Sequence, residues 1–333
     1  MLEGTVGPEE PANYTGEWRS EFKPSLDLFS LFAAAAIPLI FGVPGNILAF
    51  LVACQKQNRK LSPSIYMAAM AVVDNLFLLD VGIAVLWNKW LSDSRYLKYV
   101  IRGHLFIIYT TSTLSGFFLA GMSIDRLTAV RFSMQAPTLC TVERAKWFII
   151  ISTLITAGLN IHVFFAIQHF RDLELGINAA VFRVDNHPEY ELLATSFQVL
   201  VGTVLPFIVI FGCNILIISS LRQASLDRNK MGSEKNQQLE KNTHYLTRML
   251  IFVSFAFVIF TLPYRLCHLI QMIPQLGYDL SKVYERERYV TMVWSLAIAW
   301  ELNYAVNFFL YCIGGGQRYR NDTLEILQKL RCT

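Results

Sequence analysis

The chain has 333 residues, of which 54% are hydrophobic and 16% charged, and its net charge is +4. A soluble domain carries about 25% charged residues, so the composition excludes an ordinary water-soluble fold and indicates that much of the surface meets lipid. A net charge this small gives no indication of nucleic-acid binding. The six cysteines show no CxxC spacing, which argues against a zinc site.

Seven apolar segments follow one another, each long enough to cross about 30 Å of hydrocarbon as a helix. Each is expected to be helical because lipid offers no partner to a free backbone amide. We expect them at residues 28–54, 63–88, 97–131, 142–168, 190–224, 242–274 and 288–312. The predicted class is all-α membrane: an N-terminal tail at 1–27, a seven-transmembrane helix bundle at 28–312, and residues 313–333 after it.

Lysine and arginine are unevenly distributed among the connections. The first, third and fifth connections and the C-terminal segment carry them, whereas the N-terminal tail and the segment before the fifth helix are acidic or mixed. Basic connections face the cytoplasm. The pattern therefore predicts a multi-pass protein of the plasma membrane, with its N-terminus extracellular and its C-terminus cytoplasmic.

Both ends of the chain carry further signals. Asn13-Tyr-Thr is an N-glycosylation acceptor on the predicted outside, whereas Asn321-Asp-Thr lies on the inside and is expected to stay unmodified. After the glycines at 314–316, apolar residues recur at near-helical spacing among arginines and lysines, which predicts a short amphipathic eighth helix on membrane lipid. Cys332 beside it is either palmitoylated or a free thiol.

Polar groups inside the apolar segments are costly in lipid and are therefore informative. In chain order they are Asn46 after Gly45, Asp74 after Ala-Val-Val, Asp125-Arg126-Leu, Pro206, Thr261-Leu-Pro-Tyr after Phe257, Asn303, and Asn307-Phe-Phe-Leu-Tyr311. In kind and order they resemble the rhodopsin-like (class A) G-protein-coupled receptors over nearly the whole chain. The resemblance implies a receptor that binds an extracellular ligand and activates a heterotrimeric G protein, with arrestin as a further partner.

Shorter motifs resemble FMRFamide-type neuropeptide receptors. They are Thr138-Leu-Cys-Thr with Glu143-Arg-Ala-Lys, and the Asn-Phe-Phe-Leu-Tyr-Cys ending of the seventh segment. Other positions depart from the family pattern. Residues 169–191 hold no cysteine for the usual disulfide, whose helix-three position is about Ile101. Thr261 replaces the sixth-helix tryptophan and Phe308 the seventh-helix proline.

The resemblance assigns G-protein coupling and activation to the inner ends of the helices. Asp125 holds Arg126 until activation frees it, Asn307 and Tyr311 belong to the same switch, and Asn214 replaces the tyrosine that packs on the freed arginine. The alternative for Arg126 is a snorkelling arginine at the membrane interface.

A second predicted site is a mid-membrane cavity for a sodium ion. Its expected ligands are Asp74, Ser115, Asn303 and Asn307, whose oxygens suit a small hard cation. The alternative is a protonated Asp74 that is hydrogen-bonded to the two asparagines. No other cofactor is expected.

A third predicted site is an aromatic-rich outer cavity with two ionisable groups, Arg265 and Glu301, which bind a ligand or form a structural salt bridge with each other. The further ligand-binding candidates are Trp87, His104, Tyr109, Ser112, Gln198, Tyr264, His268 and Trp294, with Trp300 beside them.

The ligand predicted is a peptide, with a small organic ligand of a chemosensory or orphan receptor as the alternative. Helix three has Ile108 where amine receptors carry an aspartate, and helix seven has no lysine for retinal, so an amine receptor and a light sensor are excluded. A constitutively active receptor, a transporter or channel, and a membrane enzyme remain as other classes. The last two lack an inverted repeat and a nucleophile motif, respectively, so the chain is not expected to be an enzyme.

Overall fold

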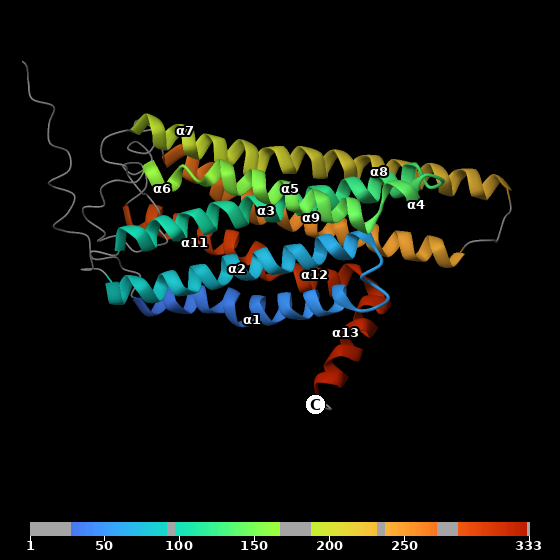
Figure 1. Cartoon of the computed structure of the whole chain (residues 1–333), viewed down its shortest axis with the longest axis horizontal. Helices are drawn as coiled ribbons and strands as arrows, with labels where there is room; N and C mark the ends of the chain where they lie inside the picture. The colour runs from blue at the N-terminus through green and yellow to red at the C-terminus, as the bar shows by residue number, and fades with distance from the viewer. Residues whose placement is uncertain (1–27, 92–96, 167–187, 232–236, 272–285, 332–333) are drawn as a thin grey trace, which may run out of the picture.

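The computed structural model describes residues 28–91, 97–166, 188–231, 237–271 and 286–331. These residues are almost entirely helical, and the long helices lie side by side along one axis (Figure 1). In chain order they are α1 (Leu28–Cys54), α2 (Ser62–Leu91), α3 (Leu97–Arg131), α4 (Ala136–Leu139), α5 (Val142–Asn160), α6 (Val163–Ala166), α7 (Pro188–Val199), the π-helix η1 (Leu200–Val204), α8 (Leu205–Met231), α9 (Gln237–Gln271), α11 (Arg286–Ala305), α12 (Asn307–Gly314) and α13 (Gly316–Arg331).

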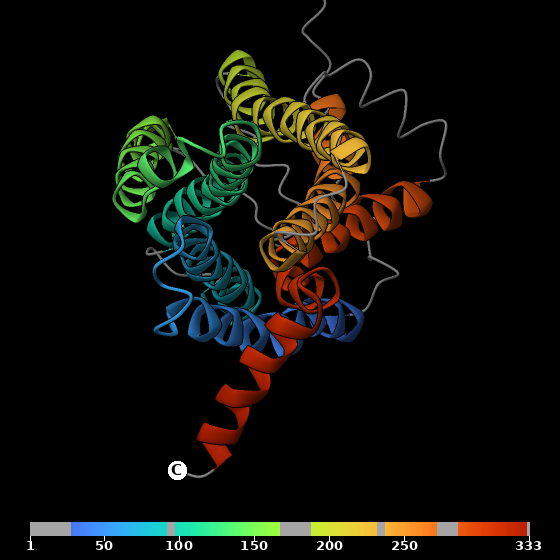
Figure 2. The ribbon, with the colours of Figure 1, turned by 90° about the vertical axis from the view of Figure 1, so that its right-hand side faces the viewer.

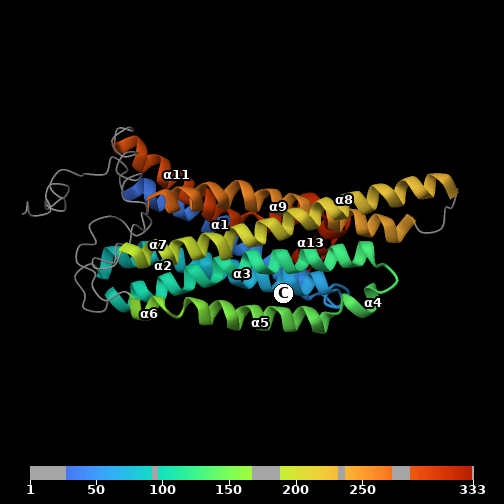
Figure 3. The same cartoon turned by 90° about the horizontal axis from the view of Figure 1, so that it is seen from above.

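Viewed from one end, the helices form a closed ring from which α13 points outward (Figure 2). We call the end that carries α4, α13 and the turn after α1 the inner end, and the opposite end the outer end. Figure 3 shows α5 along one side of the bundle, next to α3, with α4 at its inner end. The all-helical class is as predicted.

Five described helical rods are long and apolar enough to cross a membrane, and the bent pair Ser295–Ala305 with Asn307–Gly314 is a sixth candidate. The five lie in α1, α2, α3, α7 to α8, and α9. Helix α5 completes the ring. Its 19 residues are mostly apolar, and its charged residues, Glu143, Arg144 and Lys146, lie near its start. Large apolar side chains such as Leu154, Ile208 and Ile259 are exposed on the outside of the bundle, as a lipid-facing surface requires.

Local chemistry accounts for several boundaries at the inner end. The Thr141 side chain accepts a hydrogen bond from the Arg144 backbone N–H and caps α5. Gly316 has φ +63, which lets the chain turn from α12 into α13. A side chain at Gly314 would place a Cβ 2.5 Å from the Met249 Cα, so glycine allows α12 to pass close to α9.

Two irregularities depart from the predicted uninterrupted fifth and seventh helices. The chain bends by 55° between Ala305 and Asn307, although no proline lies there. The Asn46 Nδ2 of α1 donates to the Tyr304 carbonyl at 2.9 Å, so a neighbouring helix satisfies a carbonyl next to the bend. The π-helix η1 precedes Pro206, which has no backbone N–H to donate to the preceding turn.

The core consists of two clusters. The first is built around Met70, Phe118, Met122 and Tyr311, and the second around Phe77, Tyr264, Trp300 and Tyr304. The second cluster contains the aromatic partner of Arg265, so it forms the wall of the candidate ligand site described below.

Candidate functional site

At the inner end, Asp125 and Arg126 lie near the end of α3. The Asp125 Oδ2 accepts a 2.8 Å hydrogen bond from the Ser62 hydroxyl at the start of α2, and the Arg126 Nη2 lies 3.3 Å from the same oxygen. The Asp125 side chain is 9% exposed and the Arg126 side chain is 14% exposed. The carboxylate therefore ties the arginine to α2 and α3, and the Arg126 Nε has no hydrogen-bond partner among the described residues.

Cys140 adds a third contact to this group. Its thiol donates to the Asp125 carbonyl at 3.3 Å. Desolvation, followed by the nearby Asp125 charge, raises the pKa of Cys140 from 9.0 to about 11. Cys140 is therefore a neutral thiol that holds the segment after α4 against α3.

The other predicted activation residues occupy separate places. Tyr311 is almost fully buried, its hydroxyl lies 3.9 Å from the Met70 sulfur, and its ring packs edge-on to Tyr319. Asn214 on α8 is half-buried, and its Oδ1 has no partner in the described part of the chain. No described hydrogen bond joins Arg126 to Asn214 or Tyr311.

The four predicted sodium ligands are all buried. The Asn307 Nδ2 donates to the Asp74 Oδ2 at 2.7 Å, and Ser115 lies within hydrogen-bond reach of the same side chain. The Asp74 Oδ1 has no hydrogen-bond partner in the described residues. A buried carboxylate oxygen without a donor among the described residues fits a hard cation.

In the outer half, Arg265 of α9 crosses the space between three helices. Its Nη2 donates to the Ser112 hydroxyl of α3 at 2.9 Å, and its guanidinium carbon lies 4.7 Å from the ring centroid of Trp300 on α11. Tyr264 stacks on Trp300 at 4.8 Å and on His268 at 6.0 Å. These predicted ligand-site residues are therefore brought together.

The Arg265–Glu301 salt bridge that the sequence left open is not formed. Both residues are buried, at 4% and 5% exposure, yet no ion pair joins them, and Glu301 has no hydrogen bond to any described residue. Two ionisable groups thus lie inside the outer half of the bundle without neutralising each other through contact.

Two predicted ligand residues have structural partners. The His104 Nδ1 lies 2.7 Å from the Asp80 Oδ2, which joins α3 to α2. Gln198 bonds to Asn160 and accepts from the Thr113 hydroxyl at 3.2 Å, which joins α7 to α5 and α3. Tyr109 accepts from the Ser112 hydroxyl through its carbonyl at 3.2 Å.

Four predicted site residues lie outside the described part of the structure: Asn13, Cys332 and the side chains of Trp87 and Trp294.

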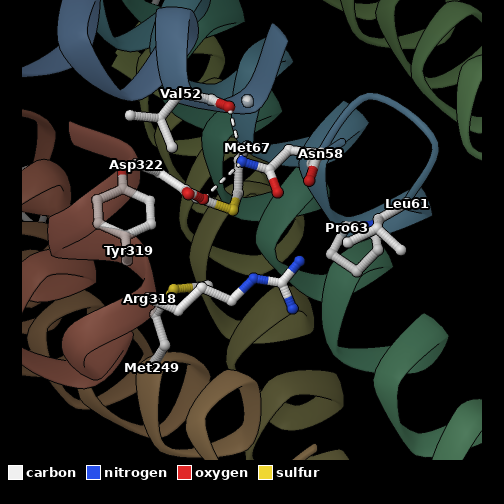
Figure 4. Close-up of a pocket in the computed structure, with 11 residues that line it drawn as sticks. Val52, Asn58, Leu61, Pro63, Met67, Met249, Arg318, Tyr319 and Asp322 are labelled. Atoms are coloured by element: carbon white, nitrogen blue, oxygen red, sulfur yellow. Dashed lines mark hydrogen bonds between the residues drawn. The ribbon is translucent and has the colours of Figure 1, made fainter. Parts of the chain in front are cut away.

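The inner end also has a small pocket that the sequence did not predict (Figure 4). Asp322 of α13 accepts from the Gln57 and Asn58 side chains at 2.9 Å each, and the Asp322 carbonyl accepts from Gln55 at 3.0 Å. These three hydrogen bonds, which we call the latch, hold α13 against the turn after α1. The sequence signal for it was Asp322, one of two acidic residues among the basic residues of α13. The lining residues are Val52, Ala53, Asn58, Leu61, Pro63, Ser64, Met67, Met249, Arg318, Tyr319 and Asp322.

Comparison with known proteins identifies the family. Residues 45–310 match the family described as 7 transmembrane receptor (rhodopsin family). The chain is 24% identical to cysteinyl leukotriene receptor 1 of Sus scrofa over 68% of its own length and 64% of the relative's, and 25% identical to somatostatin receptor type 4 of Rattus norvegicus over 76% and 64%. It is 25% identical to C-C chemokine receptor type 7 of Homo sapiens over 90% and 77%.

The matched part of the chain thus spans 64% of the length of the first two relatives. The family match covers the bundle from Gly45 to Leu310 and includes the Asp74, Asp125 and Arg265 sites. On that match and the helical ring, the chain belongs to the rhodopsin family of seven-transmembrane receptors.

Proposed function

We propose that the chain is a G-protein-coupled receptor of the plasma membrane, with an extracellular N-terminus, whose ligand is a neuropeptide. Its family consists of receptors, and its relatives are a somatostatin, a C-C chemokine and a cysteinyl leukotriene receptor. Because these names point to different ligands, the neuropeptide assignment rests on the FMRFamide-type motifs alone. The observation that carries the coupling function is the Asp125–Arg126–Ser62 contact at the inner end.

The proposed mechanism is a shift between two arrangements of the bundle. In the described one, Asp125 and Ser62 hold Arg126 against α2 and α3. An agonist that binds the outer site more tightly in the open arrangement favours that arrangement. Arg126 then leaves Asp125 and faces a helix of the G protein in the groove between the inner helix ends. Arrestin is proposed to use the same groove, and α13 to lie on membrane lipid.

Nucleotide exchange tests this function. We expect Arg126→Ala to abolish basal and ligand-driven exchange on heterotrimeric G proteins while surface expression stays intact. Arg131→Ala is the matched control, because Arg131 is an exposed arginine at the end of the same helix. Unchanged exchange in Arg126→Ala would refute the switch. A ligand screen with calcium and cyclic-AMP readouts identifies the agonist.

We further propose that Asp74, Ser115, Asn303 and Asn307 hold a sodium ion. The unpartnered Asp74 Oδ1 supports a cation over a protonated carboxyl that both asparagines satisfy. Replacing choline chloride by sodium chloride is expected to raise the Tm of the purified receptor by roughly 2 °C or more, because ligand binding stabilises the folded state. Asp74→Asn should remove the difference between the salts. Equal Tm values in both salts for the unmutated receptor would favour the protonated carboxyl.

A further inference from the structure

Arg265 is a buried cation without a described anionic partner. It is 4% exposed, and its two described partners are the Ser112 hydroxyl and the Trp300 ring, both uncharged. Its Nε is buried and has no hydrogen-bond partner among the residues that the structure describes. An arginine offers five N–H donors in a planar fork, and a buried charge is costly unless it is paired and hydrogen-bonded. The described contacts leave much of that capacity unused.

No carboxyl group of the described spans forms a contact ion pair with Arg265. The buried acidic residues there are Asp74, Asp80 and Glu301. Asp74 accepts from Asn307, Asp80 pairs with His104, and Glu301 forms no ion pair with Arg265. Within the described residues, the Arg265 charge is therefore left without a contact anion.

The surroundings of Arg265 fix its orientation. The Ser112 hydroxyl donates to the Tyr109 carbonyl and so presents a lone pair to the Arg265 Nη2. Trp300 lies under the guanidinium plane and is itself held by stacking on Tyr264 and by an edge contact with Phe77. A guanidinium held in this way leaves its Nε–H, and the N–H groups that Ser112 does not take, for an anionic partner.

We propose that Arg265 binds a carboxylate of the receptor's ligand through its Nε–H, and that the aromatic residues Tyr264 and Trp300 contact the apolar part next to that carboxylate. This inference rests on the proposed receptor function, not on the neuropeptide assignment, and it gives the ligand as an organic acid. Either the C-terminal carboxylate of a peptide or the carboxylate of a lipid supplies this chemistry. Arg265 recognises the acid group, and the aromatic wall excludes water, which strengthens the ion pair.

The first test needs no ligand. Replacing an unpaired buried charge with an apolar side chain of similar length is expected to stabilise the free receptor. We therefore expect Arg265→Met to raise the Tm of the purified receptor. Arg59→Met, at an exposed arginine of the inner turn, is the control and should leave the Tm unchanged. A fall in Tm for Arg265→Met would show that the arginine has its compensation within the protein and would overturn the proposal.

The second test uses paired probes: medium- and long-chain fatty acids with their primary amides, and short peptides with a free or an amidated C-terminus. Thermal-shift titration of the purified receptor reports binding without a G protein. At least one free acid should bind at least about tenfold more tightly than its amide. Arg265→Met should abolish that preference, Arg265→Lys should keep part of it, and Arg59→Met should keep all of it.

The outcomes separate the sources and the two proposals. A preference confined to the fatty acids or to the peptides identifies the source of the carboxylate and supports the proposal. No preference for any acid, or a preference that survives in Arg265→Met, overturns it. Because thermal shift does not depend on nucleotide exchange, a receptor that binds acids but fails to activate a G protein refutes the coupling function and leaves the acid site intact.

Discussion

Each buried ionisable residue of the bundle has a different kind of partner, and the partner indicates its role. Asp80 faces a histidine, Asp125 an arginine and a serine, and Asp74 an asparagine, whereas Arg265 faces only neutral groups. A salt-bridged or hydrogen-bonded group mainly holds helices together. A group that is buried but underused is a candidate for binding, which sets Arg265, Glu301 and the Asp74 Oδ1 apart from the others.

Cys140 provides a prediction about pH. Desolvation and the Asp125 charge raise its pKa to about 11, so the folded protein disfavours the thiolate. Relative to an unfolded thiol with a pKa of 9.0, its contribution to stability is present below pH 9 and is lost as the pH rises towards 11. In a variant whose only cysteine is Cys140, we expect the alkylation rate to rise with a midpoint near pH 11.

Asp125→Asn in the same background should lower that midpoint, because it removes the negative charge beside the thiol. A midpoint near 9 in the parent would contradict the buried position of Cys140 against α3.

Candidate site residues could be predicted from the sequence, but the residues with which they form hydrogen bonds or ion pairs could not. The sequence indicated His104 as a ligand contact or a satisfied core histidine and Gln198 as a ligand contact, and the structure pairs them with Asp80 and Asn160 on other helices. It left the Arg265–Glu301 salt bridge open, and no contact ion pair joins the two in the structure. Such pairings depend on helix rotation and tilt, which apolar periodicity within one segment does not specify. Arg265 and Glu301 stood out in the sequence because an ionisable residue in a lipid-length segment is costly wherever it points.

At the scale of elements, local signals were sufficient where they were strong. The predicted bounds of α1 and α3 coincide with the structure, and the glycines at 314–316 marked the start of α13. The bend after Ala305 was not predicted, because Phe308 stands where proline would have signalled it. The group that satisfies the backbone there, Asn46, lies 258 residues away in the chain. A break supported by another helix leaves little trace in its own segment.

Helix α13 carries the element-scale prediction. Asp322 accepts hydrogen bonds from two side chains of the turn after α1 and is buried at 8% exposure. Asp322→Ala removes both hydrogen bonds, each worth about 1 kcal/mol, although the Asn58 Nδ2 keeps its bond to the Val52 carbonyl, so α13 should open more often. We expect faster amide hydrogen exchange across residues 316–331 in this variant.

Glu325→Ala is the matched control for the latch, since Glu325 lies one turn along the same helix and pairs only with the exposed Lys329. Its exchange should match that of the unmutated protein. Equal exchange in the Asp322 and Glu325 variants would mean that apolar packing through Tyr319 and Ile326, and not the latch, holds α13.

For the whole molecule, the distribution of cationic residues indicates one orientation, and the two glycosylation acceptors allow it to be tested. Arg59, Arg144, Lys146 and Arg320 are all exposed at the inner end, where cationic residues face the cytoplasm. Of the two glycosylation acceptors, Asn321 lies on α13 at that same end, and Asn13 precedes α1. An even number of membrane crossings would place both acceptors on one side, whereas the seven-helix arrangement separates them.

The two acceptors therefore give an internally controlled test of topology. In cells, Asn13→Gln should remove a glycosidase-sensitive mobility shift, and Asn321→Gln should leave it unchanged, because only lumenal and extracellular acceptors are modified. Epitope tags extend the test: an N-terminal tag should be stained on intact cells, and a C-terminal tag only after permeabilisation. Staining of both tags on intact cells would refute an odd number of crossings. Arg126 would then not face the cytoplasm, where the G protein lies, and the proposed coupling would be refuted together with the topology.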